Sequence, residues 1–278
     1  MRCFRVLMSV LFCALCAAAQ VQYGTVKREI VEERLKALSP DNSKRESILK
    51  DTFAQSGCSE LTEQPVKHVK QPNLICVLPG QTASTIVVGA HLDKVAMGTG
   101  AVDDWSGASL LPSLYQSLTG LKHAHTYIFI AFSGEEDGLV GSRFYVKNLS
   151  PAEREKIVAM VNLECLGVSP TKIWVSHSDK NLVNILANTA NALHVPVSAV
   201  NVDYVGTDDS ESFRHEKMAN ITIHSITQDT FPILHSPRDE IKAINLDEYY
   251  ESYRLAAAYL AVLDKTLPAN SPGAPDSK

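Results

Sequence analysis

Short runs rich in β-branched residues alternate along this chain with segments in which apolar residues recur at helical spacing. Six runs have the length and composition of strands: 74–77, 85–89, 126–132, 157–163, 172–175 and 221–226. Helical spacing covers five later segments: 106–118, 139–147, 182–193, 212–217 and 246–263. Strands that alternate with helices pair mainly in parallel, and the helices then cover both faces of the sheet. The sequence therefore predicts an α/β fold: a single-domain three-layer sandwich around a central, mostly parallel mixed sheet.

Length, composition and charge agree with a soluble globular protein. The chain has 278 residues, of which 45% are hydrophobic and 21% charged, as expected for one large α/β domain. Two more helices are predicted ahead of the first strand, over 25–38 and 43–53. The formal net charge is -5, and no stretch concentrates Lys and Arg. Nucleic acid is therefore not an expected partner, because binding to it requires a basic face.

The first residues differ from the rest of the chain. Arg2 and Arg5 precede an apolar run over 6–16, and small residues follow at 17–19. This is the pattern of a secretory signal peptide. The run is shorter than the roughly 20 residues of a membrane-spanning helix, so a retained anchor is the weaker alternative. We expect three parts: a signal peptide over 1–19, a folded domain over 20–267 and a disordered tail over 268–278. The sequence therefore predicts a secreted or periplasmic protein without a stable membrane anchor.

Signal cleavage would change the cysteine inventory. It would remove three of the six cysteines and leave Cys58, Cys76 and Cys165, an odd number. Cys58 and Cys76 flank a predicted hairpin, and an oxidising compartment would allow a disulfide between them. Spacing in sequence says little about geometry, so both the disulfide and two free thiols stay open. Cys165 lies in an apolar strand and is predicted to be a buried free thiol.

Acidic and imidazole side chains follow the predicted strands. His91 and Asp93 come directly after the strand 85–89, and Asp103 and Asp104 occupy a loop just before a helix. Ligands gather at the carboxyl ends of strands in such folds. Each signal alone also has a plain structural interpretation. A histidine at a strand end is often structural, and Asp104 or Ser106 is suited to cap the helix.

Three adjacent acids, Glu135, Glu136 and Asp137, follow the strand 126–132. Adjacent carboxylates repel one another, so either the loop is solvated or a cation holds it together, and a divalent metal is the economical candidate. Two neighbouring Glu residues can then divide the work. One binds metal, while the other accepts a proton from an attacking water.

Glu164 and His235 complete the candidate set. Glu164 ends the apolar strand 157–163, where an unpaired acid would be costly to bury. His235 lies in a Pro-containing loop, whereas its rival His224 lies in an apolar strand and is predicted to be structural. Two imidazoles and three carboxylates suit zinc, and manganese or cobalt less well. Two metal ions that share one carboxylate explain five ligands better than a single crowded ion.

The order of these motifs resembles the M28 family of zinc peptidases. The similarity extends over about residues 91–239, through five motifs: His91–Asp93, Gly100–Gly107, Glu135–Ser142, Asn162–Glu164 and His235. Each motif is weak alone, and their order and placement after strands make the set specific. The resemblance implies a zinc peptidase domain over 20–267.

The resemblance also implies a role for each matching residue. Two Zn²⁺ ions would be held by five ligands: His91, Asp103, Glu136, Glu164 and His235. His91 and Glu164 would hold one ion, Glu136 and His235 the other, and Asp103 would bridge them. Glu135 would act as general base, and Asp93 would orient His91. The peptide bond between Asp103 and Asp104 would be cis, as in similar enzymes.

Two positions depart from the family pattern. Many members carry Ser-Asp-His-x-x-Phe where this chain has residues 208–213, and Ser210 replaces the usual His. The residue before His235 is Leu234 rather than an aromatic residue, so no tyrosine can stabilise an oxyanion from that position. Tyr204 is the alternative candidate for this role.

Together these residues predict a metalloexopeptidase of the aminopeptidase type. It would be a secreted, zinc-dependent enzyme that removes N-terminal residues from peptide substrates through a metal-activated bridging water. Asp208 or Asp209 is suited to anchor the free α-amino group, which favours an aminopeptidase over a carboxypeptidase. Two alternatives stay open: a glutaminyl cyclase-type zinc acyltransferase and a non-catalytic M28-like binding ectodomain. The sequence leaves the preferred N-terminal residue and the oligomeric state open.

Overall fold

A computed structural model describes residues 21–204 and 206–269. The predicted signal peptide and most of the predicted tail lie outside the described residues. The chain forms one eight-stranded sheet: β1 (Leu61–Gln64), β2 (Asn73–Leu78), β3 (Thr85–His91), β4 (Thr126–Phe132), β5 (Ile157–Glu164), β6 (Lys172–Ile173), β7 (Ser198–Ala199) and β8 (Asn220–His224). Within the described ranges, no helix is both long enough and apolar enough to cross a membrane.

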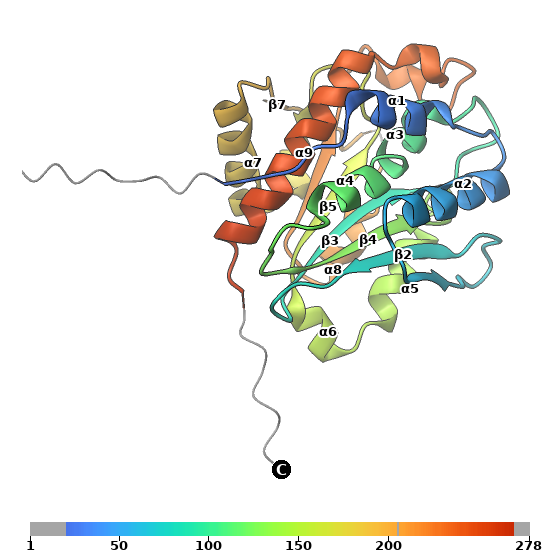
Figure 1. The fold of residues 1–278 in the computed structure, drawn as a ribbon. Helices are drawn as coiled ribbons and strands as arrows, with labels where there is room; N and C mark the ends of the chain where they lie inside the picture. The colour runs from blue at the N-terminus through green and yellow to red at the C-terminus, as the bar shows by residue number, and fades with distance from the viewer. Residues whose placement is uncertain (1–20, 205, 270–278) are drawn as a thin grey trace, which may run out of the picture.

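The strands lie in the order β1-β2-β4-β3-β5-β8-β6-β7 (Figure 1). The central strands β4, β3, β5 and β8 run parallel, and β6 pairs in parallel with β7. The pairs β1–β2, β2–β4 and β6–β8 are antiparallel. The predicted mixed, mostly parallel sheet is therefore confirmed.

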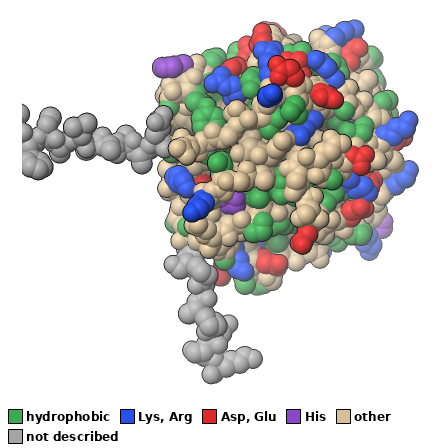
Figure 2. Space-filling model, viewed as in Figure 1, with side chains coloured by type: hydrophobic (Ala, Val, Ile, Leu, Met, Phe, Trp, Pro, Cys, Tyr) green, Lys and Arg blue, Asp and Glu red, His purple; other side chains and the backbone are tan. Residues whose placement is uncertain are grey.

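Nine α-helices in the described residues surround this sheet: α1 (Arg28–Lys36), α2 (Asn42–Gln55), α3 (Ser106–Ala108), α4 (Leu111–Leu118), α5 (Val140–Asn148), α6 (Pro151–Lys156), α7 (Lys180–Leu193), α8 (Ser210–His215) and α9 (Leu246–Thr266). Four short helical turns add to them: η1 (Ala101–Trp105), η2 (Val175–His177), η3 (Phe231–Ile233) and η4 (Ile241–Ala243). Helices α1, α4, α7 and α9 lie on one side of the sheet (Figure 1). The surface viewed from that side mixes Lys and Arg with Asp and Glu (Figure 2).

Successive residues of β3 pack against opposite layers. Ile86 and Val88 belong to the larger apolar cluster, which includes residues of α4, α7 and α9. Val87 joins the smaller cluster with Phe132 and Phe213, on the α5 and α8 side. Strand side chains alternate between faces, so an unbroken apolar strand such as β3 must be covered on both. Because β3 is buried on both faces, the position of its last residue, His91, is fixed.

Several element boundaries differ from the prediction. The helix expected over 106–118 is two helices, α3 and α4, and Pro112 lies in the first turn of α4. Proline has no N–H to continue a preceding helix, which explains the break. The strand expected over 172–175 is only Lys172–Ile173, because the chain turns into η2 at Val175. The prediction missed the short strands β1 and β7 and the helix α6.

The structure shows the state of the three cysteines outside the predicted signal peptide. Cys58 and Cys76 form a disulfide, with their Cα atoms 6.3 Å apart, that joins the segment after α2 to β2. Cys165 is a buried free thiol, as expected. It directly follows β5 instead of lying within a strand, and its φ of 50° takes the chain out of the sheet.

Candidate metal centre

The candidate residues meet at one edge of the sheet because β4, β3 and β5 are parallel neighbours. His91 is the last residue of β3, and Glu164 is the last residue of β5. Glu135 and Glu136 follow β4 in the loop before α5. Parallel strands end at the same side, so sheet topology alone brings these four side chains together.

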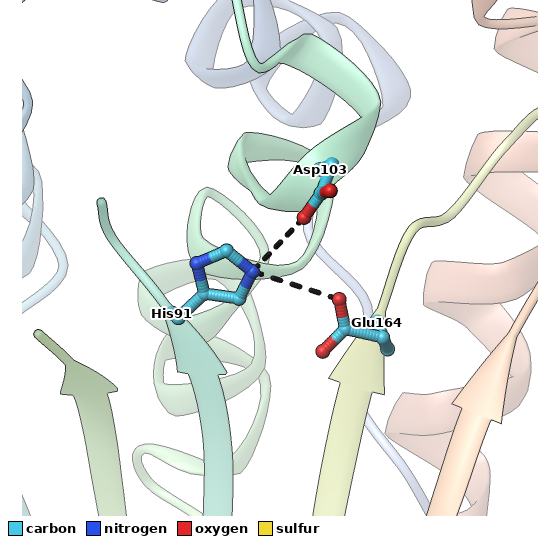
Figure 3. A group of neighbouring side chains, drawn as sticks. All are labelled: His91, Asp103 and Glu164. Atoms are coloured by element: carbon cyan, nitrogen blue, oxygen red, sulfur yellow. Dashed lines mark hydrogen bonds and ion pairs between the residues drawn. The ribbon is translucent and has the colours of Figure 1, made fainter. Parts of the chain in front are cut away.

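Asp103 lies between the two candidate histidines. Its Oδ1 is 3.0 Å from Nε2 of His91, and its Oδ2 is 3.1 Å from Nε2 of His235. Nε2 of His91 also lies 3.6 Å from Oε1 of Glu164 (Figure 3), and Nε2 of His235 lies 3.0 Å from Oε2 of Glu136. Two compact groups of potential ligand atoms therefore share one carboxylate: His91, Asp103 and Glu164, and Asp103, Glu136 and His235.

Asp93 holds the loop that carries the two glutamates. The main-chain N–H groups of Glu135 and Glu136 each donate to one carboxylate oxygen of Asp93, at 3.2 Å. Burial alone would raise the pKa of this carboxyl, but the nearby His91 ring, whose Nδ1 lies 3.7 Å from Oδ1, and the hydrogen bonds from these amides hold it below its usual range. Asp93 thus orients both neighbouring motifs.

The carbonyl oxygen of Asp93 also sets the tautomer of His91. Nδ1 of His91 lies 3.2 Å from that oxygen. A carbonyl only accepts hydrogen bonds, so the ring proton of neutral His91 is on Nδ1. Its Nε2 lone pair then points at Asp103 and Glu164, as a metal-binding imidazole requires.

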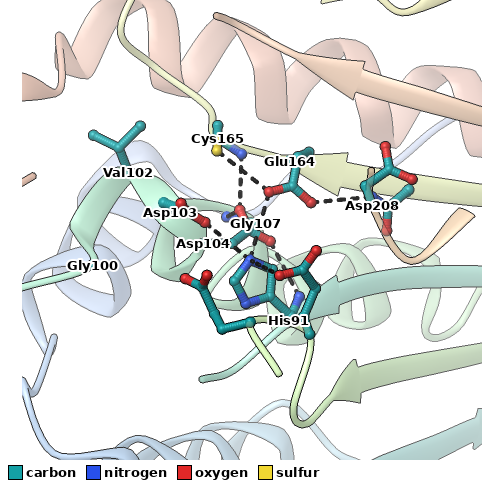
Figure 4. Close-up of polar contacts among 12 residues, drawn as sticks. His91, Gly100, Val102, Asp103, Asp104, Gly107, Glu164, Cys165 and Asp208 are labelled. Atoms are coloured by element: carbon teal, nitrogen blue, oxygen red, sulfur yellow. Dashed lines mark hydrogen bonds and ion pairs between the residues drawn. The ribbon is translucent and has the colours of Figure 1, made fainter. Parts of the chain in front are cut away.

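Asp104 has a different function from Asp103, to which it is joined by a cis peptide bond. Its Oδ1 accepts from the N–H groups of Gly107, at 3.1 Å, and Cys165, at 2.9 Å, and its Oδ2 accepts from that of His91, at 3.2 Å (Figure 4). Asp104 is not the N-cap residue of α3, which is Trp105, but the bond from Gly107 ties its carboxylate to the first turn of that helix. This carboxylate links the ends of β3 and β5 to α3.

The carboxyl groups of this centre are shielded from solvent and lie close together, and both effects shift their pKa values. Burial raises the pKa of Glu135 well above its usual range, and burial together with the nearby Asp103 raises that of Glu136 to about 7. Hydrogen bonding to Asp103 raises the pKa of His235 to about 9. Burial would lower the pKa of His91, but Glu135 and the adjacent carboxylates raise it well above its usual range. Carboxylates so close together favour a bound cation.

A cavity of about 220 Å³ opens beside this centre. Its acidic rim consists of Asp103, Glu135, Glu136 and Glu164. Apolar side chains form much of the remaining wall: Trp174, Val202, Ile226, Phe231 and Leu234. Such a cavity can hold an apolar group next to the charged centre.

Two further residues had predicted roles: His224 as a structural histidine and Tyr204 as the alternative candidate to stabilise an oxyanion. Nε2 of His224 lies 3.0 Å from the Val200 carbonyl, and its Nδ1 accepts from the N–H of Ile226 at 3.1 Å. Burial lowers its pKa to about 4, so this histidine is neutral and structural, as predicted. Tyr204 is 67% exposed and packs edge-on against Phe231, outside the cavity lining.

Sequence reasoning missed Asp239. Its Oδ1 accepts from the N–H of Val102 at 2.7 Å, and its Oδ2 accepts from that of Asp103 at 3.4 Å. Its carbonyl accepts from the N–H and hydroxyl of Thr99, both at 2.8 Å. Asp239 therefore fixes the loop that presents Asp103. Its only sequence signal is its position four residues after His235.

The sheet topology and the acidic-imidazole centre define a family. The chain belongs to peptidase family M28, whose model matches residues 73–260. Among curated relatives, it is similar to leupeptin-inactivating enzyme 1 of Streptomyces exfoliatus, with 32% identity over 51% of this chain and 33% of that protein. A probable leucine aminopeptidase of Arthroderma otae is 22% identical over 78% of this chain and 63% of its own length. The chain thus spans less than two thirds of these relatives.

Solved structures share the fold. The LapA aminopeptidase of Legionella pneumophila superposes with a TM-score of 0.71 at 24% identity, over 91% of this chain and 79% of LapA. A glutaminyl cyclase from an Acidobacteriales bacterium gives a TM-score of 0.70 at 18% identity, over 86% of this chain and 93% of that chain. At these identities, the two neighbours support the α/β architecture alone.

Proposed function

We propose that this chain is a zinc-dependent aminopeptidase with two zinc ions. The observation that carries the proposal is the sharing of Asp103 by two groups of potential ligands, one with His91 and Glu164 and one with Glu136 and His235. Imidazole and carboxylate donors without thiolate suit zinc. When bound, zinc would polarise a substrate carbonyl and lower the pKa of water held between the two ions.

Glu135 is the proposed general base. It does not belong to the two ligand groups that share Asp103, although it forms a third group of potential ligands with His91 and Glu136. Its Oε2 lies 3.9 Å from Nε2 of His91. Burial raises its pKa, so this carboxylate readily accepts a proton. Glu135 takes the proton of the attacking water and returns it to the leaving amine. Asp93 keeps both glutamates in place through the main-chain bonds to its carboxylate.

The cavity supports a substrate with an apolar N-terminal residue. Trp174, Ile226 and Phe231 supply apolar wall next to the acidic rim. The proposed anchor for the free α-amino group is Asp208, which also lines the cavity. Its two oxygens accept from the Ser210 N–H and the Thr222 hydroxyl, and each keeps a lone pair for an ammonium group.

We propose a signal peptide over residues 1–19, a zinc peptidase domain over 20–267 and a tail over 268–278. The disulfide between Cys58 and Cys76 is consistent with an oxidising compartment, such as a periplasm or the extracellular space.

The test is release of amino acids from matched dipeptides with free or acetylated N-termini. Leu, Phe, Lys and Glu at the first position would measure the preference of the cavity. The protein is assayed as purified, after chelation, and after zinc is restored. Hydrolysis of free-amine substrates only, lost on chelation and regained with zinc, is the expected result.

The two alternatives predict other outcomes. A glutaminyl cyclase-type acyltransferase would convert peptides with N-terminal glutamine to the cyclic product and release no amino acid. A non-catalytic binding ectodomain would process no peptide in either assay. Hydrolysis that survives removal of all bound metal would refute the zinc-dependent proposal.

A further inference from the structure

Arg45 is a buried cation outside the segment matched by the family model. It belongs to α2 and is 0% exposed, whereas the match begins at residue 73. Burial of a guanidinium is costly unless its N–H groups all find acceptors. The acceptors of Arg45 therefore indicate which part of the molecule it stabilises.

The five N–H groups of Arg45 donate to main-chain carbonyls. The acceptor oxygens, between 2.6 and 3.2 Å away, belong to Ser39, Leu92, Asp93, Thr99 and Gly100. Leu92 and Asp93 directly follow His91, and Thr99 and Gly100 closely precede Asp103. One side chain thus bridges the two loops that carry His91 and Asp103.

The fit around this guanidinium is close on both sides. Gly100 has a φ of +63°, and a Cβ atom there would lie 2.5 Å from Nη2 of Arg45. The guanidinium carbon lies 5.5 Å from the ring centroid of Trp105, which belongs to η1 together with Asp103. A shorter or differently shaped cation could not make the same five contacts.

The charge of Arg45 also complements the acidic centre. Burial lowers its pKa to about 10, and the nearby Asp239 and Asp93 oppose that change, so the guanidinium stays protonated at neutral pH. Four carboxylates attract this positive charge: Asp239, Asp93, Asp104 and Asp103. Such a charge favours the ionised carboxylates on which metal binding depends.

We infer that Arg45 is a positioning residue for the zinc centre, because it sets the spacing between the loop after β3 and the loop that presents Asp103. The inference rests on the proposed zinc-dependent function. It makes α2 part of the catalytic unit, although α2 lies ahead of the matched family segment.

The test compares two substitutions of Arg45 with a control arginine. Arg45→Lys keeps the charge but has three donors on one nitrogen, and Arg45→Met removes both charge and donors. Arg34→Lys is the control, since Arg34 is a partly buried arginine of α1 that donates to the side chains of Ser113 and Gln116 on α4. Two quantities are measured: the zinc dissociation constant, by competition with a chromophoric chelator, and amide hydrogen exchange of the metal-free protein.

Arg45→Lys should weaken zinc binding by roughly 10- to 100-fold, the usual effect of losing a residue that supports metal ligands. Exchange should accelerate in the loops around 92–95 and 99–105, and Arg34→Lys should change neither quantity. If Arg45→Met fails to fold, Arg45→Lys decides alone. A zinc dissociation constant within twofold of the wild type, or unchanged exchange in these loops, overturns the inference. If the wild type binds no zinc, the proposed function fails, and the exchange measurement still decides whether Arg45 positions the loops.

Discussion

Glu135 and Glu136 are neighbours in the sequence with different surroundings. Oε1 of Glu136 accepts from the N–H of Val95 at 3.3 Å, and its Oε2 lies 3.0 Å from Nε2 of His235. Glu135 instead has its Oε2 3.9 Å from Nε2 of His91, and burial raises its pKa. Because these two adjacent glutamates have different partners, we expect them to have different roles.

Glu135→Gln should abolish peptide hydrolysis without loss of metal. The amide cannot accept the proton of the attacking water, so kcat should fall by roughly 10²- to 10⁴-fold. Turnover of free-amine dipeptides and zinc content by atomic absorption measure the two effects. Asp137→Asn is the matched control, because Asp137 is exposed in the same loop. Activity above a tenth of the wild type in Glu135→Gln would rule out Glu135 as the base.

Zinc affinity should rise with pH. In the metal-free protein, the pKa of Glu136 is about 7 and that of His235 is about 9. Both groups must lose a proton before they bind metal, so protons compete with zinc below these values. The zinc dissociation constant should therefore decrease steadily from about pH 6 to about pH 9, with release of protons detectable by calorimetry in buffers of different ionisation enthalpy. An affinity independent of pH in this window would exclude these two groups as ligands.

At the scale of elements, Asp264 joins the end of α9 to the segment before β4. Its Oδ1 accepts from the N–H groups of Ala124, at 2.8 Å, and His125, at 2.9 Å, and lies 3.3 Å from Nδ1 of His125. Burial alone would raise the pKa of Asp264, but the bonds from His125 and Lys265 lower it well below its usual range. The final helix is thereby attached to the central sheet far from the metal centre.

Asp264→Asn should destabilise the fold by about 1.5–3 kcal/mol at neutral pH, the usual contribution of hydrogen bonds to a charged group. A depressed folded pKa stabilises the protein above the unfolded pKa of about 3.9, and this contribution is lost as the pH falls towards the folded value. The difference between variant and wild type should therefore shrink below about pH 4. Urea unfolding at several pH values measures it, with Asp229→Asn, at an exposed position, as control. An equal difference at all pH values would contradict the ionic contribution.

At the scale of the whole molecule, the metal centre connects distant parts of the chain. His91 ends β3, Glu164 ends β5, and His235 comes from the loop before α9. Arg45 adds α2 through its bonds to the loops next to His91 and Asp103. A ligand that binds only when these parts are assembled stabilises the folded state as a whole.

Zinc should therefore raise the melting temperature of the protein. At a free zinc concentration 1,000 times the dissociation constant, one site contributes about 4 kcal/mol. For a domain of this size, that corresponds to a shift of roughly 8–16 °C per site. Differential scanning calorimetry with chelator and with zinc measures the shift. His235→Ala should keep part of it, whereas Asp103→Asn, which alters the shared ligand, should lose most of it. Equal shifts in both variants would contradict a shared Asp103.

The local pattern of the chain was sufficient for the class of fold and for the candidate residues. Alternating strand and helix signals predicted the parallel centre of the sheet, and β4 begins and ends where its apolar run does. The five ligand candidates lie together because three of them follow or end neighbouring parallel strands. Their roles as zinc ligands and the role of Glu135 stay predictions. Pro112 shows the limit at element boundaries, since its effect outweighs the helical periodicity around it.

The sequence by itself determined the residue types at the strand ends, because hydrophobic periodicity and side-chain chemistry are local properties. Only the tertiary structure decided which groups support them. Arg45 and Asp239 act on main-chain atoms of distant loops, and a carbonyl or an amide has no signature in the sequence. The cavity wall from Trp174 to Leu234 likewise exists only after folding, since packing brings together apolar residues that are far apart in the chain.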